Sequence, residues 1–383
     1  MKQQTGPKIL IFIDWFAPGF KAGGPIASCL NFIHLMKDDY SLFVFTGDTD
    51  LGETTPYQNI TAGKWITAGS NDCMVFYADS SKPVLKQIRN AVTEINPDFV
   101  YLNHLFSPKF VLYPLWLKWK GFIRCRVVLA PRGALYESAL AVKPYKKMPF
   151  LKLFRQMGVH KKLRFHATSD REQNALLHYF PGSEVLVADD LPNTKQPAYK
   201  STRKEKGILK CVFIARIHPI KNLLFLLTAL QQVKSAAQLT IIGPLEDPAY
   251  WEKCKAQIAL LPANIRADYA GALPNDALLP VLQDHHLFVL PTKGENFGHA
   301  IFESFLAGRP VLISDQTPWL QLTAIKTGWD LPLSNPGDFT AAIETAADWD
   351  QFNFDDWGQA AWHHAKTFIE NPALKKSYLQ LFS

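Results

Sequence analysis

The chain has 383 residues, of which 48% are hydrophobic and 20% charged, an ordinary globular composition with material for two cores. Its five cysteines are scattered and form no CxxC pair, so we expect neither a disulfide framework nor a zinc site, and a reducing compartment fits better. The N-terminal apolar run, Ile9–Ile13, is too short for a signal-peptide core or a membrane span, and no later stretch reaches the roughly eighteen apolar residues of a span. The sequence therefore predicts a soluble, cytoplasmic protein that could still rest on a membrane surface.

The charges are unevenly distributed along the chain. Residues 1–195 hold 24 Lys and Arg against 16 Asp and Glu, whereas residues 196–383 hold 17 against 18. Within residues 109–171 there are 15 basic residues and two acids, Glu137 and Asp170. The N-terminal half is therefore expected to carry a concentrated basic face.

Short apolar runs bounded by turn residues recur, with helix-like segments between them, and such runs are typical of buried parallel strands. In the first half the expected strands are Lys8–Asp14, Ser41–Thr46, Met74–Tyr77, Phe99–Asn103, Val127–Ala130, Phe165–Thr168 and Glu184–Ala188. In the second half they are Lys210–Ala215, Gln238–Gly243, Ala267–Ala270, Leu287–Pro291 and Pro310–Ser314. Strands that alternate with helices predict two Rossmann-like, doubly wound α/β domains.

A polar, lysine-rich stretch over 194–207 separates the two series of strands. We expect one domain over 1–195 and a second over 208–355. The remaining segment, 356–383, has helical character and carries five aromatic residues, namely Trp357, Trp362, Phe368, Tyr378 and Phe382.

The first strand leads into a glycine pair, Gly23-Gly24, that precedes Pro25 and a helical segment. Proline suits the first turn of a helix, and glycines let the backbone approach a phosphate closely. A plain strand-to-helix turn is the alternative. The dinucleotide fingerprint GxGxxG is absent, which disfavours a Rossmann oxidoreductase.

Two polar residues follow strands in the middle of the first domain. His104 ends the strand Phe99–Asn103 and could bond a sugar hydroxyl, although a lone histidine is more often structural. Arg132 follows the next strand on the same side and could bind an acceptor or a phosphate.

Two basic segments, 113–126 and 143–164, interleave Lys and Arg with Trp, Phe, Leu and Met. This pattern favours an amphipathic surface that lies on anionic lipid, or one that binds an acidic acceptor. Solvated helix surface is the alternative. Nucleic acid fits poorly, because no binding motif accompanies the charge.

In the second domain, the segment FIARIHPIKN directly follows a strand and places Arg216 and Lys221 five residues apart. Two cations at this position could neutralise a diphosphate as it leaves. Taken alone, an Arg and a Lys near the end of a strand are more often surface charges.

The most informative segment is KGENFGHAIFESFLAGRPVLIS, residues 293–314, in which Glu295 and Glu303 are separated by seven residues. A helix that begins near Phe297 would direct its first N–H groups at a phosphate, and Gly298 would permit close approach. Glu295 could accept bonds from sugar hydroxyls, and Glu303 could reach a ribose diol. The alternative is that both glutamates are solvated helix surface.

These segments resemble glycosyltransferase family 4, a retaining family with the GT-B fold. Residues 293–314 are similar to its E-x7-E motif and its GxPV turn, with Asn296 where the family often has Gly and His299 where it often has an apolar residue. FIARIHPIKN is similar to the family's G-R-x-x-x-x-K-N stretch, with Ala215 in place of Gly. The Gly23-Gly24 loop resembles the family's P-x-x-G-G loop, and His104 resembles a histidine at this place in the family.

The resemblance implies two domains that face a central cleft, with 1–195 on the acceptor side, 208–355 on the donor side and 356–383 crossing back as a helix. It implies a metal-independent, retaining transfer in which no enzymic nucleophile takes part. The implied catalytic residues are Glu295, His104, Arg216 and Lys221. The implied donor-binding residues are Gly23, Gly24, Asn296, Phe297, Gly298, His299 and Glu303. Arg132 is the candidate for acceptor or phosphate binding.

The resemblance also implies a nucleotide-sugar donor, a UDP-sugar first and a GDP- or ADP-sugar as alternatives, with no cofactor and no metal. A glycan or lipid-linked acceptor, in cell-envelope, lipopolysaccharide or exopolysaccharide assembly, fits the basic surface. Contact with the inner face of the cell membrane would run through residues 113–164, and no nucleic acid is expected. One alternative is a GT-B sugar-nucleotide epimerase, which would share the fold and the donor. Another is a catalytically silent sugar-nucleotide-binding protein, and the intact Glu295, Arg216 and Lys221 argue against that one.

Overall fold

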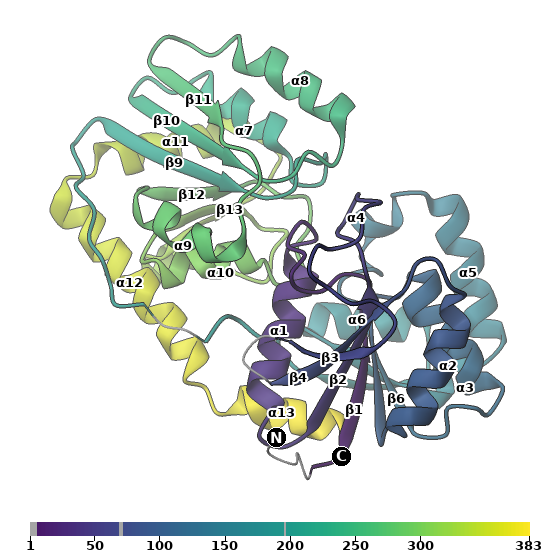
Figure 1. Ribbon diagram of the computed structural model, residues 1–383. Coiled ribbons are helices and arrows are strands. Elements are labelled where there is room, and N and C mark those ends of the chain that lie inside the picture. The colour runs from purple at the N-terminus through teal and green to yellow at the C-terminus, as the bar shows by residue number, and fades with distance from the viewer. Residues whose placement is uncertain (1–5, 69–71, 195–196) are drawn as a thin grey trace. The chain divides into compact units, whose positions relative to one another are not determined.

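A computed structural model describes residues 6–68, 72–194 and 197–383. The chain divides into two compact units. Unit 1 comprises Met1–Leu191 and Pro372–Ser383, and unit 2 comprises Pro192–Asn371 (Figure 1). Unit 1 is therefore built from both ends of the chain.

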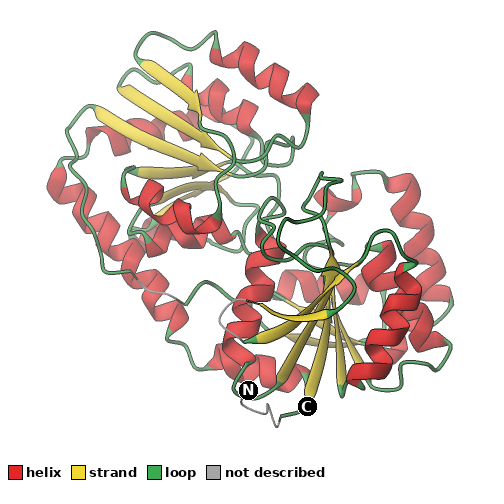
Figure 2. Cartoon of the chain, in the orientation of Figure 1, coloured by secondary structure: helices red, strands yellow, loops and turns green. Residues whose placement is uncertain are grey.

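Unit 1 contains an eight-stranded sheet with the order β3-β4-β2-β1-β5-β6-β7-β8. Every neighbouring pair is parallel except β3 and β4, which are antiparallel. The strands are β1 (Lys8–Phe12), β2 (Ser41–Gly47), β3 (Trp65–Ala68), β4 (Cys73–Ala78), β5 (Phe99–Asn103), β6 (Arg126–Ala130), β7 (Arg164–Ala167) and β8 (Glu184–Val187). The central strands are apolar on both faces because helices cover both sides (Figure 2).

Helices α1 and α13 pack on one face of this sheet. The ring of Phe32, on α1, lies 5.1 Å from Tyr101 of the sheet and 5.7 Å from Tyr378 of α13, centroid to centroid. A second core covers the opposite face and takes its buried side chains from α2, α3, α5 and α6. The helices are α1 (Gly24–Met36), α2 (Val84–Ile95), η1 (Pro108–Leu112), α3 (Tyr113–Trp119), α4 (Glu137–Leu140), α5 (Pro144–Gln156), η2 (Val159–Lys162), α6 (Asp170–Tyr179) and α13 (Ala373–Leu381).

Unit 2 contains a six-stranded parallel sheet with the order β11-β10-β9-β12-β13-β14. Its strands are β9 (Ile208–Ile214), β10 (Ala236–Ile242), β11 (Ile265–Tyr269), β12 (Leu287–Leu290), β13 (Val311–Ser314) and β14 (Gly328–Leu331). Its helices are α7 (Leu223–Leu230), α8 (Pro248–Ile258), α9 (Asn275–Gln283), α10 (His299–Leu306), η3 (Leu322–Ile325), α11 (Pro336–Asp348) and α12 (Gln351–Ile369). The strand order reverses at β9 and β12, and in doubly wound sheets ligands bind beyond the carboxyl ends of the strands at such a point.

Every strand expected from the sequence is present, and the expected pair of doubly wound α/β folds is confirmed. Two strands were not expected. β3 is an antiparallel edge strand of four residues, and β14 begins with Gly328 and contains Asp330. Both lie at a sheet edge, where a strand needs fewer apolar residues because one side is unpaired.

The final segment differs from the single helix expected over 356–383. α12 begins at Gln351, packs against α10 in unit 2 and ends at Ile369, and α13 follows in unit 1. Pro372 separates the two helices, and a proline has no N–H to continue the hydrogen-bond ladder of α12. Only the last twelve residues, Pro372–Ser383, therefore belong to unit 1.

No helix in the described ranges is both long enough and apolar enough to cross a membrane.

Candidate functional site

Three loops meet at the carboxyl edge of the sheet in unit 2, following β9, β12 and β13. The N–H of Lys293, in the loop after β12, donates a 2.7 Å hydrogen bond to the carbonyl of Ile220, in the loop after β9. The N–H of Glu295, also in the loop after β12, donates a 3.0 Å hydrogen bond to the carbonyl of Gln316, in the loop after β13. Backbone bonds of this kind give fixed positions to side chains that lie far apart in the sequence.

Lys221 and Glu295 form an ion pair across two of these loops. Their side chains are 14% and 13% exposed, so the pair is largely shielded from water but still reachable. The sequence named both residues as candidates without predicting this contact. The structure thus places a cation directly against the first acid of the spaced glutamate pair.

Arg216, the second candidate cation, has a different partner. Its Nη1 atom lies 2.5 Å from Oε2 of Glu246, which follows β10, and both side chains are about one-third exposed, at 35% and 31%. Arg216 lies at the same edge of the sheet as Lys221, because it follows β9 directly. The structure therefore joins Lys221, and not Arg216, to Glu295.

Helix α10 begins at His299, two residues later than expected, with Gly298 as its N-cap. Gly298 has φ 82°, in the left-handed region that favours glycine, and an added Cβ would lie 2.7 Å from Cδ1 of Ile301. Asn296 lies in the loop before the cap and is partly buried, as is His299. The cap geometry directs the first turn of α10 to the edge where the three loops meet.

Phe297 has a different environment from the one expected of a ligand-binding side chain. Its ring is buried against Trp319 and Phe302, at centroid distances of 5.2 and 5.7 Å, and its carbonyl accepts a 2.6 Å bond from Nε1 of Trp319. Phe297 therefore anchors the loop in the core of unit 2. Any contact with a ligand would involve its backbone.

Glu303 lies in α10 and is partly buried. Burial raises the pKa of Glu303 to about 7, and the nearby His299 opposes this rise. A carboxyl with such a pKa can change protonation near neutral pH, which is unusual for a solvated helix glutamate. Glu303 is therefore not a solvated glutamate on the surface of a helix, which was the alternative for this position.

Gly23 and Gly24 lie where α1 begins in unit 1. Gly23 is the N-cap with φ 63°, Gly24 is the first helical residue, and Pro25 follows it. An added Cβ on Gly23 would meet nothing within 4 Å, so it is the backbone conformation and not crowding that requires glycine here. The space beside this helix N-terminus is open.

His104 directly follows β5 in a left-handed conformation with φ 73°, and its side chain is exposed. Its N–H donates to the carbonyl of Ala130 at 2.9 Å, and its Nδ1 accepts from the N–H of Phe106 at 3.3 Å. A non-glycine residue rarely adopts this φ, and such strain concentrates at functional sites.

Asp14, which was not among the residues expected at a site, follows the neighbouring strand β1. Its Oδ1 accepts a 2.7 Å bond from Oγ of Ser107, which also caps η1. Burial raises the pKa of Asp14, although this bond and the charge of Lys109 lower it. The signal was available, because Asp14 interrupts the apolar run of the first strand.

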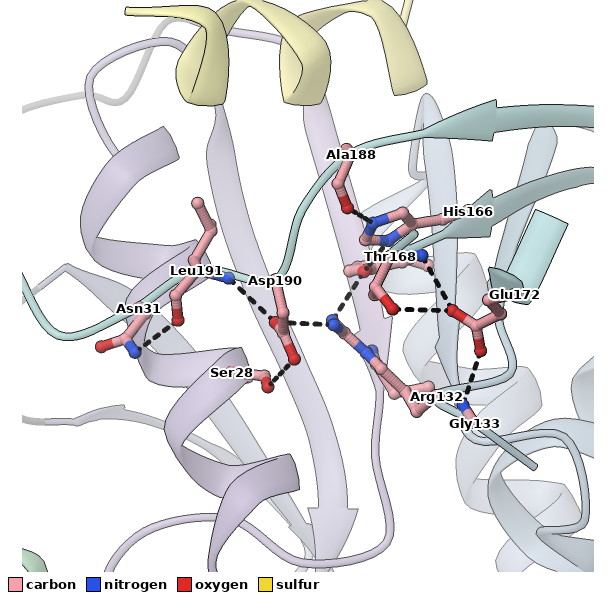
Figure 3. A network of polar contacts seen from close by, with 12 residues as sticks. Ser28, Asn31, Arg132, Gly133, His166, Thr168, Glu172, Ala188, Asp190 and Leu191 are labelled. Atoms are coloured by element: carbon pink, nitrogen blue, oxygen red, sulfur yellow. Dashed lines mark hydrogen bonds and ion pairs between the residues drawn. The ribbon is translucent and has the colours of Figure 1, made fainter. Parts of the chain in front are cut away.

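Arg132 is the centre of a buried polar network in unit 1 (Figure 3). Its Nη1 lies 2.7 Å from Oδ1 of Asp190, and these side chains are 8% and 4% exposed. Its Nη2 donates to the Tyr101 hydroxyl at 2.9 Å and to Oδ1 of Asn103 at 3.3 Å. The guanidinium expected to bind an acceptor or a phosphate is thus committed to internal partners.

The network continues through histidine. Nε2 of His166 lies 2.8 Å from the carbonyl of Ala188, which can only accept, so this nitrogen carries the proton. Nδ1 of His166 therefore accepts from the Tyr101 hydroxyl at 2.8 Å. Nearby, the buried carboxylate of Glu172 accepts from the N–H groups of Gly133 and Thr168 at 2.5 and 2.8 Å (Figure 3). These bonds fix the loop that follows β6.

Within the described ranges, no group of three or more His, Cys, Asp and Glu side chains is arranged to hold a metal ion. The segment Asp48-Thr49-Asp50 has two acids one residue apart, a spacing found in some metal sites. Here Asp50 accepts hydrogen bonds from the N–H groups of Phe20 and Lys21, at 2.9 and 3.2 Å. It therefore stabilises the loop that leads to α1.

Two kinds of similarity to known proteins were found: a family model that matches part of unit 2, and solved structures that match nearly the whole chain. Residues 209–348 match the family model described as glycosyl transferases group 1. This range includes Arg216, Lys221, Glu295 and Glu303. No curated protein matches the sequence at a significant level.

Solved structures are similar over nearly the whole chain. Sucrose-phosphate synthase from Thermosynechococcus elongatus has a TM-score of 0.71 at 15% identity, covering 98% of this chain and 98% of that one. HepE from Anabaena, solved with UDP and glucose, has a TM-score of 0.68 at 14% identity, again covering 98% of each chain. WaaG, a glycosyltransferase involved in lipopolysaccharide biosynthesis, has a TM-score of 0.64 at 11% identity, covering 97% of this chain and 98% of that one. The chain therefore has the GT-B fold, with a glycosyl transferases group 1 match over residues 209–348 of unit 2.

Proposed function

We propose that the protein is a glycosyltransferase that moves a sugar from a nucleotide-diphosphate sugar to a glycan or lipid-linked acceptor, with retention of configuration. The observation that carries the proposal is the Lys221–Glu295 ion pair, which lies in loops next to the N-terminus of α10. Both residues fall within the part of the chain that matches the family model. The proposal assigns the nucleotide sugar to unit 2 and the acceptor to unit 1.

The proposed mechanism begins with the diphosphate. Lys221 and Arg216 neutralise the negative charge that develops on the leaving group, and the first N–H groups of α10 add hydrogen bonds to it. Gly298 keeps the backbone of this turn accessible. Because protein cations and a helix N-terminus supply the positive charge, this mechanism needs no metal ion.

The remaining residues orient the sugar and the nucleotide. In the proposal, Glu295 accepts bonds from sugar hydroxyls and Glu303 accepts from the ribose diol, while Asn296 and His299 line the same site. From unit 1, His104 binds a donor hydroxyl, and the Gly23-Gly24 turn approaches the diphosphate. The acceptor attacks the face from which the leaving group departs, so the configuration at the anomeric carbon is retained.

The donor and the pathway are inferred from relatives of low identity. HepE was solved with UDP and glucose, which favours a UDP-sugar over GDP- and ADP-sugars. WaaG acts in lipopolysaccharide biosynthesis, which supports an acceptor in cell-envelope or exopolysaccharide assembly. We propose a cytoplasmic enzyme of glycosyltransferase family 4 that works at the inner face of the membrane.

A ligand screen tests the proposal. UDP-, GDP- and ADP-sugars are added separately, and the melting temperature is measured for the wild type and for Glu303→Ala. We expect one base to raise the melting temperature, and the shift to shrink in the variant, because a ligand that binds the native state stabilises it by mass action. No shift with any nucleotide sugar would overturn the donor assignment.

Product analysis then tests the reaction. Incubation of the stabilising donor with envelope glycans or lipid-linked acceptors should yield a glycoside of unchanged anomeric configuration and free nucleoside diphosphate. A changed sugar nucleotide or free sugar as the sole product would instead identify an epimerase. Binding without turnover in the presence of a broad set of acceptors would identify a silent sugar-nucleotide-binding protein.

A further inference from the structure

The outer face of α3 carries a row of aromatic side chains. Tyr113, Trp116 and Trp119 follow one another at intervals of three residues and are 39%, 45% and 52% exposed. Residues three apart lie on the same side of a helix, so the three rings form one row. Nζ of Lys120 lies 4.6 Å from the ring centroid of Trp119 and adds a positive charge to this row. Large aromatic rings are normally buried in a protein, so an exposed row needs a partner.

Helix α5 presents a second mixed face. Tyr145 and Leu153 lie eight residues apart on one side of the helix and are 69% and 56% exposed, and Met157 at its end is 50% exposed. Exposed basic residues lie among them, namely Lys146, Lys152 and Arg155. The buried side of the helix, with Leu151 and Phe154, packs into the core of unit 1.

The two helices belong to one surface. Both lie on the face of the unit 1 sheet opposite α1 (Figure 1). In the middle of α5, the ring of Phe150 lies 5.7 Å from that of Phe106, which is two residues before the start of η1. Near the end of α5, Lys162 of η2 is close enough to Lys118 of α3 to lower the pKa of that lysine, which burial already lowers. We call the outer sides of α3, α5 and η2 the basic aromatic face.

The exposed basic residues of this face have no ion-pair partner within the described ranges. Its exposed basic residues, with those of the adjoining loops and η1, are Lys109, Lys120, Arg124, Lys143, Lys146, Lys152, Arg155, Lys161 and Lys162. Throughout the part of the chain that the structure describes, none of these nine forms an ion pair. By contrast, an exposed lysine of unit 2, Lys326, pairs with Asp356 at 2.7 Å.

We propose that the basic aromatic face docks on the surface of an anionic lipid bilayer, with the rings of α3 at the headgroup level and the lysines of α5 against lipid phosphates. Trp and Tyr favour the membrane–water interface, and basic side chains beside them are attracted by anionic headgroups. A second copy of the chain is a poorer partner, because like charges would face each other across a twofold interface. The inference deepens the proposed location at the membrane by naming the surface that makes the contact, and vesicle binding can be measured without glycosyl transfer.

Sedimentation with vesicles tests the docking. The full chain is mixed with vesicles of phosphatidylcholine alone or of phosphatidylcholine with phosphatidylglycerol, and the bound fraction is measured at low and high salt. We expect binding to the anionic vesicles that weakens as salt rises, because salt screens the attraction. Comparable binding to neutral vesicles, or none to either, would overturn the proposal.

Two pairs of substitutions separate the contributions of rings and charges. Lys146→Gln with Lys152→Gln should weaken vesicle binding by about fivefold for each lysine. Trp116→Ser with Trp119→Ser should weaken it by roughly tenfold, because the rings no longer enter the interface. All four residues are exposed, so both variants should keep the wild-type melting temperature.

Matched controls come from exposed residues of unit 2. Phe352→Ser with Leu260→Ser removes apolar side chains that are 80% and 67% exposed, and Lys200→Gln with Lys253→Gln removes exposed lysines. These variants should bind vesicles as the wild type does. A tryptophan variant that binds anionic vesicles as the wild type does would contradict the proposed position of the α3 rings at the headgroup level.

Discussion

Nη1 of Arg132 lies 2.7 Å from Oδ1 of Asp190, and both side chains are nearly inaccessible to water. Asp190 lies just before the point where the chain leaves unit 1, and it also accepts a 2.7 Å bond from Oγ of Ser28 on α1. The pair thus joins the loop after β6, helix α1 and the end of the first segment of unit 1.

Asp190→Asn should destabilise unit 1 strongly. Removal of one charge from a buried pair leaves the other without compensation, at a cost of about 3 kcal/mol or more in the free energy of unfolding. Urea denaturation measures this cost. The control is Asp356→Asn, which breaks an exposed pair at the same distance of 2.7 Å and should cost less than about 1 kcal/mol. Equal losses in the two variants would contradict the structural role of Arg132.

Lys221→Ala should lower kcat at least tenfold with the donor that the ligand screen identifies, because it removes a cation proposed to stabilise the leaving diphosphate. Glu295→Gln should also lower kcat. Because the two side chains form one ion pair, the double variant should lose less than the product of the single losses. Lys326→Ala serves as a control in unit 2, and wild-type kinetics in Lys221→Ala would remove this residue from the mechanism.

Glu303 should make donor binding depend on pH. Burial raises its pKa to about 7, so the free protein holds the neutral acid below that pH, and a ribose diol prefers the carboxylate as an acceptor. Calorimetric affinity for the donor should therefore rise as the pH increases through about 7. Glu303→Gln should bind more weakly and show no such rise, and an unchanged pH profile in that variant would exclude Glu303 as the titrating group.

The same residue has an opposite effect on the stability of the free protein. The pKa of Glu303 is higher in the folded protein than in the unfolded chain, so the folded protein binds this proton more tightly. The contribution of the bound proton to stability is complete below the unfolded pKa and is lost as the pH rises through the folded pKa. The ligand-free melting temperature should fall over this window in the wild type, and fall less in Glu303→Gln.

Arg309 should be essential for the stability of unit 2. It is fully buried, and its Nη2 donates to the carbonyls of Lys200 and Gln283 at 2.8 and 2.7 Å. Arg309→Met leaves these carbonyls unsatisfied, which should cost at least about 3 kcal/mol in the free energy of unfolding. Arg266→Met, at an exposed position, should change it by less than about 0.5 kcal/mol. A similarly small effect at Arg309 would contradict this account.

Much of the fold could be predicted from the sequence, because buried parallel strands are short, apolar on both faces and bounded by turn residues. The edge strands β3 and β14 escaped prediction because half-exposed edge strands lack that pattern. The break between α12 and α13 was missed although Pro372 marks it, since the aromatic pattern continues on both sides.

The candidate site was less predictable than the fold. Spacing, the flanking strand and turn residues, and the family resemblance made Glu295 and Lys221 candidates, but their contact depends on which loops of a sheet become neighbours. Arg132 follows a strand just as His104 does, and the sequence could not distinguish them. Asp190, which lies 58 residues further along the chain, determines that Arg132 turns inward, whereas the side chain of His104 stays exposed.

The position of α13 bears on the order in which the molecule acquires its structure during synthesis. Tyr378 and Phe382 pack against Phe32 and Tyr101, so the core beside α1 lacks part of its aromatic lining until residues 372–383 have been translated. Every residue of unit 2 precedes Pro372, so the core of unit 1 is completed only after all of unit 2 has been synthesised. The half of the protein that is made first is thus the half that finishes maturing last.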